Sequence, residues 1–170
     1  PYRRQRQMCI RDRMSFVATP VPPASPPRST VAGDGWWPDI DVTAMRDALG
    51  LGPAVTHARL LGAIEGGLLT VEGQLAEWQA RAISAGAASL AQVEPDRLIA
   101  GEARAVVLWT RAVRFAAAAE IADLHTEMSA TGHGAAAAPE KRLTAADYRR
   151  LSTEAVRDLI GTPRCTVELI

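Results

Sequence analysis

The sequence is short of aromatic residues, cysteine and long apolar runs. Phe, Trp and Tyr together make up 5% of the 170 residues, and much of the 48% apolar fraction is alanine. Because burial stabilises by about 25 cal/mol per Å² and alanine buries little area, we expect a thin core in each subunit. No run of 18 apolar residues is present, which argues against a membrane-spanning helix. The two cysteines, Cys9 and Cys165, give no disulfide framework, which is typical of a reducing compartment.

The formal net charge is zero, but the charges are unevenly distributed. Residues 1–13 hold five Arg and one Asp, so the chain from Met14 onward has 14 basic and 18 acidic side chains and a net charge of −4. The first 13 residues contain no apolar run and therefore do not form a signal peptide. We interpret them as a non-native leader, similar to a translated adapter sequence, in front of a chain that begins at Met14. A basic arm that binds nucleic acid is the alternative.

Motifs for catalysis and metal binding are missing as well. The sequence has no GxSxG and no phosphate-binding glycine loop, and Cys165 has no histidine near it in sequence. The three histidines, His57, His125 and His133, do not share the short, face-sharing spacings of a metal site. We therefore expect a protein that is not an enzyme and that has no cofactor and no metal site.

The longest regular pattern predicts an amphipathic helix over residues 56–85. Its apolar residues recur at alternating spacings of three and four: Leu61, Ile64, Leu68, Val71, Leu75, Trp78 and Ala82. Thr56 suits the N-cap, and Gly86 suits a left-handed residue after the C-terminus. The adjacent Gly66 and Gly67 favour close approach of another helix. A helix of about 45 Å must be covered by another long helix or by other copies of the chain.

Three further helices are expected between residues 35 and 161. Asp41 is predicted to cap a short helix that is closed by Gly50. A second long helix, over about residues 102–129, should lie antiparallel to the first. The last helix should begin between Glu140 and Thr144 and end at Ile160, where Gly161 stops it. The predicted fold is therefore all-α, a small antiparallel helical bundle with two long helices.

The flanking segments have no helical periodicity. Residues 14–34 are rich in proline and small residues, which predicts a disordered arm. In residues 162–170, Cys165, Val167 and Leu169 alternate with Thr166, Glu168 and Ile170, as in a β-strand. Such an extended tail is suited to pairing with the sheet of another protein. The alternatives are a frayed end that packs on its own bundle, or the second helix of a DNA-binding helix-turn-helix.

Five aromatic side chains are candidates for a subunit interface. The adjacent Trp36 and Trp37 carry a large apolar area, and they either fold back on their own bundle or pack on a neighbouring subunit. The other three candidates lie on the two predicted long helices: Trp78, Trp109 and Phe115.

Three stretches resemble the head completion protein L family of temperate contractile-tailed phages. They are residues 36–41, the pair Gly101-Glu102, and residues 158–161 running into the terminal stretch. The likeness covers about residues 35–170. Its most specific part is the terminal stretch itself, which consists of Arg164, Cys165, Thr166, Val167, Glu168, Leu169 and Ile170. The pair Trp36-Trp37 stands where phenylalanines are expected, so an aromatic pair is kept.

The resemblance implies a head–tail connector adaptor in the neck of the virion, assembled in the host cytoplasm. Such adaptors form a ring, commonly twelvefold, under the portal vertex, where they help to retain the packaged genome and provide the platform for tail attachment. The implied partners are other copies of the chain, the portal protein and a tail-completion or tail-terminator protein. We expect residues 164–170 to dock on the portal.

An acidic subunit also suits a conduit through which DNA passes without sequence-specific binding. Our candidates for carboxylates that face the lumen are Glu65, Glu72, Asp123 and Glu127. The alternative function is a small helical DNA-binding regulator that uses a C-terminal helix-turn-helix.

Overall fold

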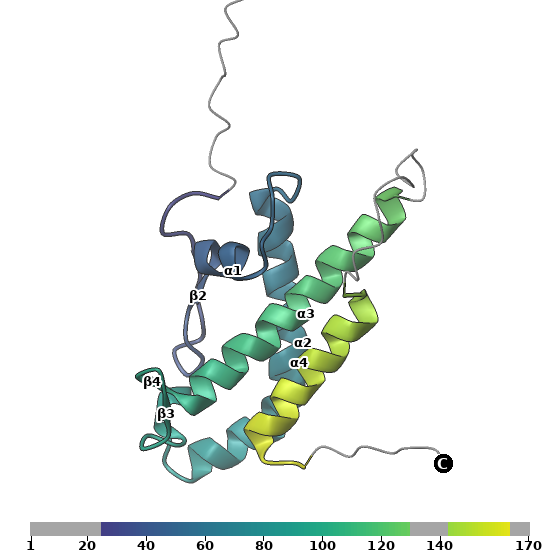
Figure 1. Cartoon of the computed structure of the whole chain (residues 1–170). Helices are drawn as coiled ribbons and strands as arrows, with labels where there is room; N and C mark the ends of the chain where they lie inside the picture. Colours follow the sequence, from purple (N-terminus) through teal and green to yellow (C-terminus); the bar gives the residue numbers. More distant parts are fainter. Residues whose placement is uncertain (1–24, 130–142, 164–170) are drawn as a thin grey trace, which may run out of the picture.

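The computed structural model of the chain describes residues 25–129 and 143–163, with side chains up to residue 124 in the first range. Figure 1 shows a mostly helical molecule. The elements, in chain order, are β1 (Thr30–Val31), β2 (Ile40–Asp41), α1 (Val42–Ala48), α2 (His57–Ser84), a single 3-10 turn η1 (Leu90–Gln92), β3 (Leu98–Ile99), β4 (Glu102–Ala103), α3 (Arg104–Ser129) and α4 (Ala145–Ile160).

Helix α3 is the central element of the fold. It packs along both α2 and α4, whereas α2 and α4 touch each other over a much smaller region. In Figure 1, α3 and α4 lie in front of α2, and the chain reverses direction from α2 to α3 and again from α3 to α4. The outer face of α2 and the joint face of α3 and α4 are therefore on opposite sides of the molecule.

The helix ends follow the capping residues in the sequence. The Thr56 hydroxyl accepts a hydrogen bond from the Arg59 backbone N–H at 3.3 Å, and Gly86 has a φ of 98° just beyond α2. The Asp41 carboxylate accepts from the backbone N–H groups of Thr43 and Ala44 at 2.7 and 2.9 Å, which caps α1. The predicted caps of the short helix and of the first long helix are thus confirmed.

The expectation of an all-α fold is wrong in one respect, because two small antiparallel sheets accompany the helices. In the first sheet, Thr30 pairs with Asp41 and Val31 with Ile40. In the second, β3 and β4 form a hairpin whose turn residues, Ala100 and Gly101, have φ angles of 51° and 86°. Two left-handed central residues are what the right-handed twist of a tight hairpin requires. Strands of two residues are too short to show the alternation by which a strand is predicted.

The first sheet also corrects the prediction of a disordered arm over residues 14–34. From residue 25 onward the arm is folded against the helices: the Val42 N–H donates to the Ser29 carbonyl at 2.9 Å, beyond the β1–β2 ladder. The chain then turns so tightly that a Cβ on Gly33 would lie 2.2 Å from the Trp37 carbonyl oxygen. The Gly33 N–H donates to the Asp39 carboxylate across this turn at 2.9 Å. Residues 14–24 lie outside the described ranges.

A cluster of indoles joins this N-terminal segment to the long helices. Trp37 is 2% exposed and stacks on the fully buried Trp109 of α3, with ring centroids 5.5 Å apart and planes at 11°. Trp36 meets Trp37 edge-on at 4.5 Å and Trp78 of α2 at 6.1 Å. The Trp36 indole N–H also donates to the Ala87 carbonyl at 3.1 Å, so its polar atom is satisfied.

Close helix contact is built into α2 at Gly67, as the adjacent glycines predicted. A Cβ on Gly67 would lie 3.1 Å from both the Ala117 backbone nitrogen and the Val113 carbonyl oxygen of α3. A Cβ on Gly73, six residues along the same helix, would meet no atom within 4 Å. The first glycine is therefore needed for packing within the subunit and the second is not.

Helix α4 begins with a capping box. Asp147 donates its backbone N–H to the Thr144 hydroxyl at 3.1 Å, and its carboxylate accepts from the Thr144 N–H at 3.0 Å and hydroxyl at 2.8 Å. These hydrogen bonds hold the pKa of Asp147 below its ordinary value. At the other end, Gly161 adopts the left-handed conformation, with a φ of 76°.

Truncation of the stacked indole tests the core. Trp37→Ala should lower the free energy of unfolding by about 3–5 kcal/mol, because it removes a buried aromatic side chain and leaves a cavity against Trp109. Chemical denaturation followed by circular dichroism measures the change. Leu98→Ala is the matched control: Leu98 is 59% exposed, so this change should stay within about 0.5 kcal/mol. Equal effects of the two substitutions would contradict the assignment of the core.

The two glycines of α2 should respond in opposite directions to alanine. Gly73→Ala should raise the free energy of unfolding by about 0.5–1 kcal/mol, because alanine favours the helix and the site is open. Gly67→Ala should lower it by about 1–3 kcal/mol, because the methyl group pushes two backbones apart. Thermal unfolding of both variants decides the matter, and a stabilised Gly67→Ala protein would refute the close contact.

The capping box predicts a pH-dependent contribution to stability. Because the folded pKa of Asp147 is lowered, its stabilising effect is present above the ordinary carboxyl pKa and is lost as the pH falls through the lowered value. The stability difference between wild type and Asp147→Ala should therefore be largest near neutral pH and shrink in acid. Urea unfolding over a pH series measures this difference. A difference that does not change with pH would exclude the role of the carboxylate.

Candidate functional site

The C-terminal end of α4 is where the predicted docking tail leaves the fold. Gly161 ends the helix, and the Thr162 N–H donates to the Arg157 carbonyl at 2.9 Å. The Arg157 guanidinium reaches past the helix end and donates to the Pro163 carbonyl at 2.7 Å. These contacts hold Thr162 and Pro163 against the end of α4. The seven predicted docking residues, 164–170, lie outside the described ranges, so their role stays a prediction.

The first residues of the tail also bear on the helix-turn-helix alternative. A recognition helix would begin at Thr162, but Thr162 and Pro163 are not helical in the described part of the chain.

We call residues 161–163 the tail root. A pocket of about 210 Å³ lies beside it. Its polar side chains pair with one another: Glu94 accepts from Arg97 at 3.1 Å and from Arg104 at 2.9 Å. Arg104 also donates to the Asp158 carbonyl at 2.9 Å, which ties the start of α3 to the end of α4. Apolar side chains complete the lining, among them Trp78, Val93 and Leu159. Because its charges are satisfied internally, the pocket suits an apolar contact better than proton transfer.

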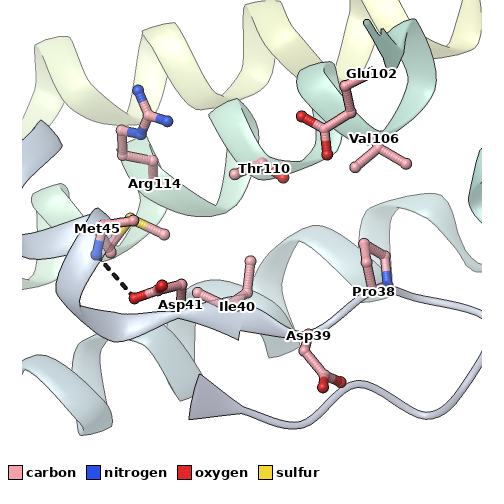
Figure 2. Close-up of a pocket in the computed structure, with 10 residues that line it drawn as sticks. Pro38, Asp39, Ile40, Asp41, Met45, Glu102, Val106, Thr110 and Arg114 are labelled. Carbon is pink, nitrogen blue, oxygen red and sulfur yellow. Dashed lines mark hydrogen bonds between the residues drawn. The ribbon is translucent and has the colours of Figure 1, made fainter. Parts of the chain in front are cut away.

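A second pocket, of about 200 Å³, lies between the N-terminal segment and α3 (Figure 2). Ile40 and Met45 line one side, and Val106, Thr110 and Arg114 of α3 line the other. Glu102 and Arg114 lie toward opposite ends of it in Figure 2. The Asp41 carboxylate at its edge is engaged in capping α1. The lining has no nucleophile paired with a base.

The five aromatic interface candidates are placed within the subunit. Trp36, Trp37 and Trp109 are buried in the chain's own core, which is the arrangement of the first alternative for the Trp36-Trp37 pair. Trp78 and Phe115 are partly exposed. Phe115 stacks on Tyr148 of α4 at 6.3 Å, and the Arg111 guanidinium lies 5.2 Å above the Phe115 ring. An interface role for the five residues stays a prediction.

The candidate lumen carboxylates differ in their surroundings. Glu65 is exposed, and Asp123 forms an ion pair with Arg149 of α4. Burial, together with the nearby negative charge of Asp34, raises the pKa of Glu72. The side chain of Glu127 lies outside the described ones. A lumen position for these groups also stays a prediction.

A polar contact between the N-terminal segment and the helices is not visible in the sequence. Arg46 of α1 is only 6% exposed and donates to the Ser25 hydroxyl at 2.9 Å and to the Gly52 carbonyl at 3.3 Å. His57 at the start of α2 lies 3.2 Å from the same hydroxyl and 3.5 Å from that of Ser29. Arg46 and His57 fasten residues 25–29 to the helices. Isolated serines and one arginine carry no spacing signal, so sequence reasoning assigned His57 no such role.

The described residues contain no group of three or more His, Cys, Asp or Glu that is suited to a metal ion. Within the same ranges, no helix is both long and apolar enough to cross a membrane.

Comparison with known proteins addresses the family of the chain directly. The family model of the phage head completion protein (GPL) matches residues 31–170. The chain is also 31% identical to the head completion/stabilization protein of Escherichia phage P2, over 154 residues that cover 91% of this chain and 89% of that protein. No solved structure gives a significant match.

The family match extends over every described element from Val31 onward and through the terminal stretch 164–170. The predicted resemblance is therefore confirmed, as is a structural role in the completion of the phage head. The chain belongs to the phage head completion protein (GPL) family.

Proposed function

We propose that this protein forms a ring below the portal vertex, closes the DNA-filled head and provides the platform on which the tail is attached. The proposal rests on the family, whose model includes the terminal stretch 164–170 as well as the helices. The twelvefold symmetry implied by the resemblance belongs to the same proposal, as do assembly in the host cytoplasm and contact with a tail-completion or tail-terminator protein.

The geometry of the tail root is the observation that carries the proposal. The Arg157–Pro163 hydrogen bond, at 2.7 Å, holds the start of the tail against the end of α4. A tail that leaves a fixed point on a rigid helix can be presented to a partner in one direction. We propose that Val167, Leu169 and Ile170 are the apolar anchors that contact the portal, with strand pairing as the binding mode.

The ring adds strength to a weak individual contact. One short tail binds weakly, but tails that are linked through a ring reinforce one another, by about 10²–10⁴-fold for each linked site. Attachment could then wait until the portal presents all its docking sites in the arrangement that follows packaging. The excess of acidic residues beyond residue 13 supports a lumen that repels the DNA backbone rather than binding it.

Removal of the tail tests this function. A chain that lacks residues 164–170 should keep its helical circular dichroism and thermal unfolding, because the described core is formed by residues that precede them. It should fail to complete heads in a complementation assay, and electron microscopy should show heads without tails or without DNA. In the full chain, Leu169→Asp should reproduce this defect, whereas Thr166→Ala, on the other face of the predicted strand, should not. Normal head completion by the truncated chain would overturn the proposed role of the tail.

A further inference from the structure

The outer face of α2 carries a second stripe that the fold leaves uncovered. It consists of six exposed residues: Gly62, Leu69, Gly73, Ala76, Ala80 and Ile83. The stripe is about 32 Å long from end to end. Leu69 and Gly73 each come two positions before a fully buried residue of the same helix. Since two residues turn a helix by about 200°, the stripe faces away from the core.

This outer stripe has the properties of a helix-packing surface rather than of a solvated face. Leu69 is 78% and Ile83 is 51% exposed, the former being the most exposed large apolar side chain among the described residues. A Cβ built on Gly62 or Gly73 would meet no atom within 4 Å. Small residues at spacings of three, four and seven let another helix approach closely, while Leu69 supplies a knob for it.

The carboxylates that flank the outer stripe limit which kind of surface can cover it. Glu72 lies beside it, half-buried, and feels the negative charge of the Asp34 carboxylate. Glu65 and Glu77 also flank the stripe and are exposed. A symmetrical contact of α2 with α2 would bring these carboxylates together from both copies, which is unfavourable. The surface instead requires a partner that is apolar and basic.

The opposite side of the same molecule has that chemistry. Arg111 is exposed on the outer face of α3, where its guanidinium lies 5.2 Å above the ring of Phe115. Phe115 stacks on Tyr148 of α4 at 6.3 Å, and Leu108 and Leu151 are partly exposed on the same two helices. The packing of α3 between α2 and α4 separates this basic aromatic face from the outer stripe.

We infer that the outer stripe of α2 binds the basic aromatic face of α3 and α4 on a second copy of this chain, with Arg111 of that copy placed against Glu72. The two patches differ and lie on opposite sides of one subunit, so the contact is heterologous, the type from which closed rings are built. The inference rests on the proposed ring and assigns the surfaces that form it.

The first experiment is a matched pair of substitutions in the full chain. Leu69→Asp should weaken self-association by about tenfold or more in sedimentation velocity over a concentration series, because it places a charge in the centre of the contact. Leu98→Asp is the control: Leu98 is 59% exposed on the β3–β4 hairpin, away from both surfaces. Both side chains are exposed in the single subunit, so thermal unfolding at concentrations where the wild type is monomeric should be unchanged in either variant. Equal behaviour of the two variants, or a wild-type chain that stays monomeric throughout, would overturn the inference.

The second experiment tests the ion pair between copies. Glu72→Arg and Arg111→Glu should each weaken self-association by about tenfold, because each places like charges in contact. The double variant should recover most of the loss, since it restores opposite charges in reversed order. A double variant that is as weak as the sum of the single changes would refute the pairing of these two residues.

The same variants separate this inference from the proposed function. If Leu69→Asp abolishes self-association but still completes heads, the surface assignment stands and the ring is not needed for function. If Leu69→Asp associates normally, the surface assignment is wrong, whatever the result of head completion.

Discussion

The stack of Trp37 on Trp109 holds the fold together, because it joins an N-terminal loop to the central helix. Trp109 is the largest fully buried side chain in the described ranges, and most of the remaining core consists of smaller aliphatic residues. Asp34 prepares the loop for this contact, since its carboxylate accepts the backbone N–H groups of both Trp36 and Trp37 at 2.9 Å. The orientation of the indoles is therefore set locally before they pack.

A core that depends on a few indoles leaves the long helices unequally covered. Near Gly67, α2 packs backbone against backbone on α3, whereas its opposite face presents Leu69 to solvent. The inferred contact between copies would cover Leu69, which is 78% exposed on a stripe of glycine and alanine. If copies associate in this way, burial of the outer stripe would add to the stability of each subunit.

The helices could be predicted from the sequence because their signals are periodic and local. Thr56 and Asp41 are capping residues next to apolar repeats, and each performs that role in the structure. The two sheets could not be predicted, since each strand has two residues and is defined by pairing across a turn. Likewise, the contact of Arg46 with Ser25 joins residues 21 positions apart that share no pattern.

The candidate site also has one part that could be identified from the sequence and one part that could not. The terminal stretch 164–170 is specific enough in sequence to indicate the family, and the family match includes it. The proposed docking role would depend on a partner surface that one chain does not contain, so no property of the helices could reveal it. The aromatic candidates show the opposite case: a tryptophan is equally suited to a core and to an interface. Only the fold decides, and it places Trp37 and Trp109 inside the subunit.

The proposed docking tail has a physical consequence for assembly. If the docking residues contributed to the core, binding to a partner would require part of the subunit to unfold, and that cost would be subtracted from the affinity. The described core is formed by residues that precede Gly161, and the Arg157 guanidinium holds Pro163 beyond the end of α4. If residues 164–170 dock as proposed, this core need not open for them to bind. Such a tail would suit an adaptor that stays unattached until many equivalent sites are presented together.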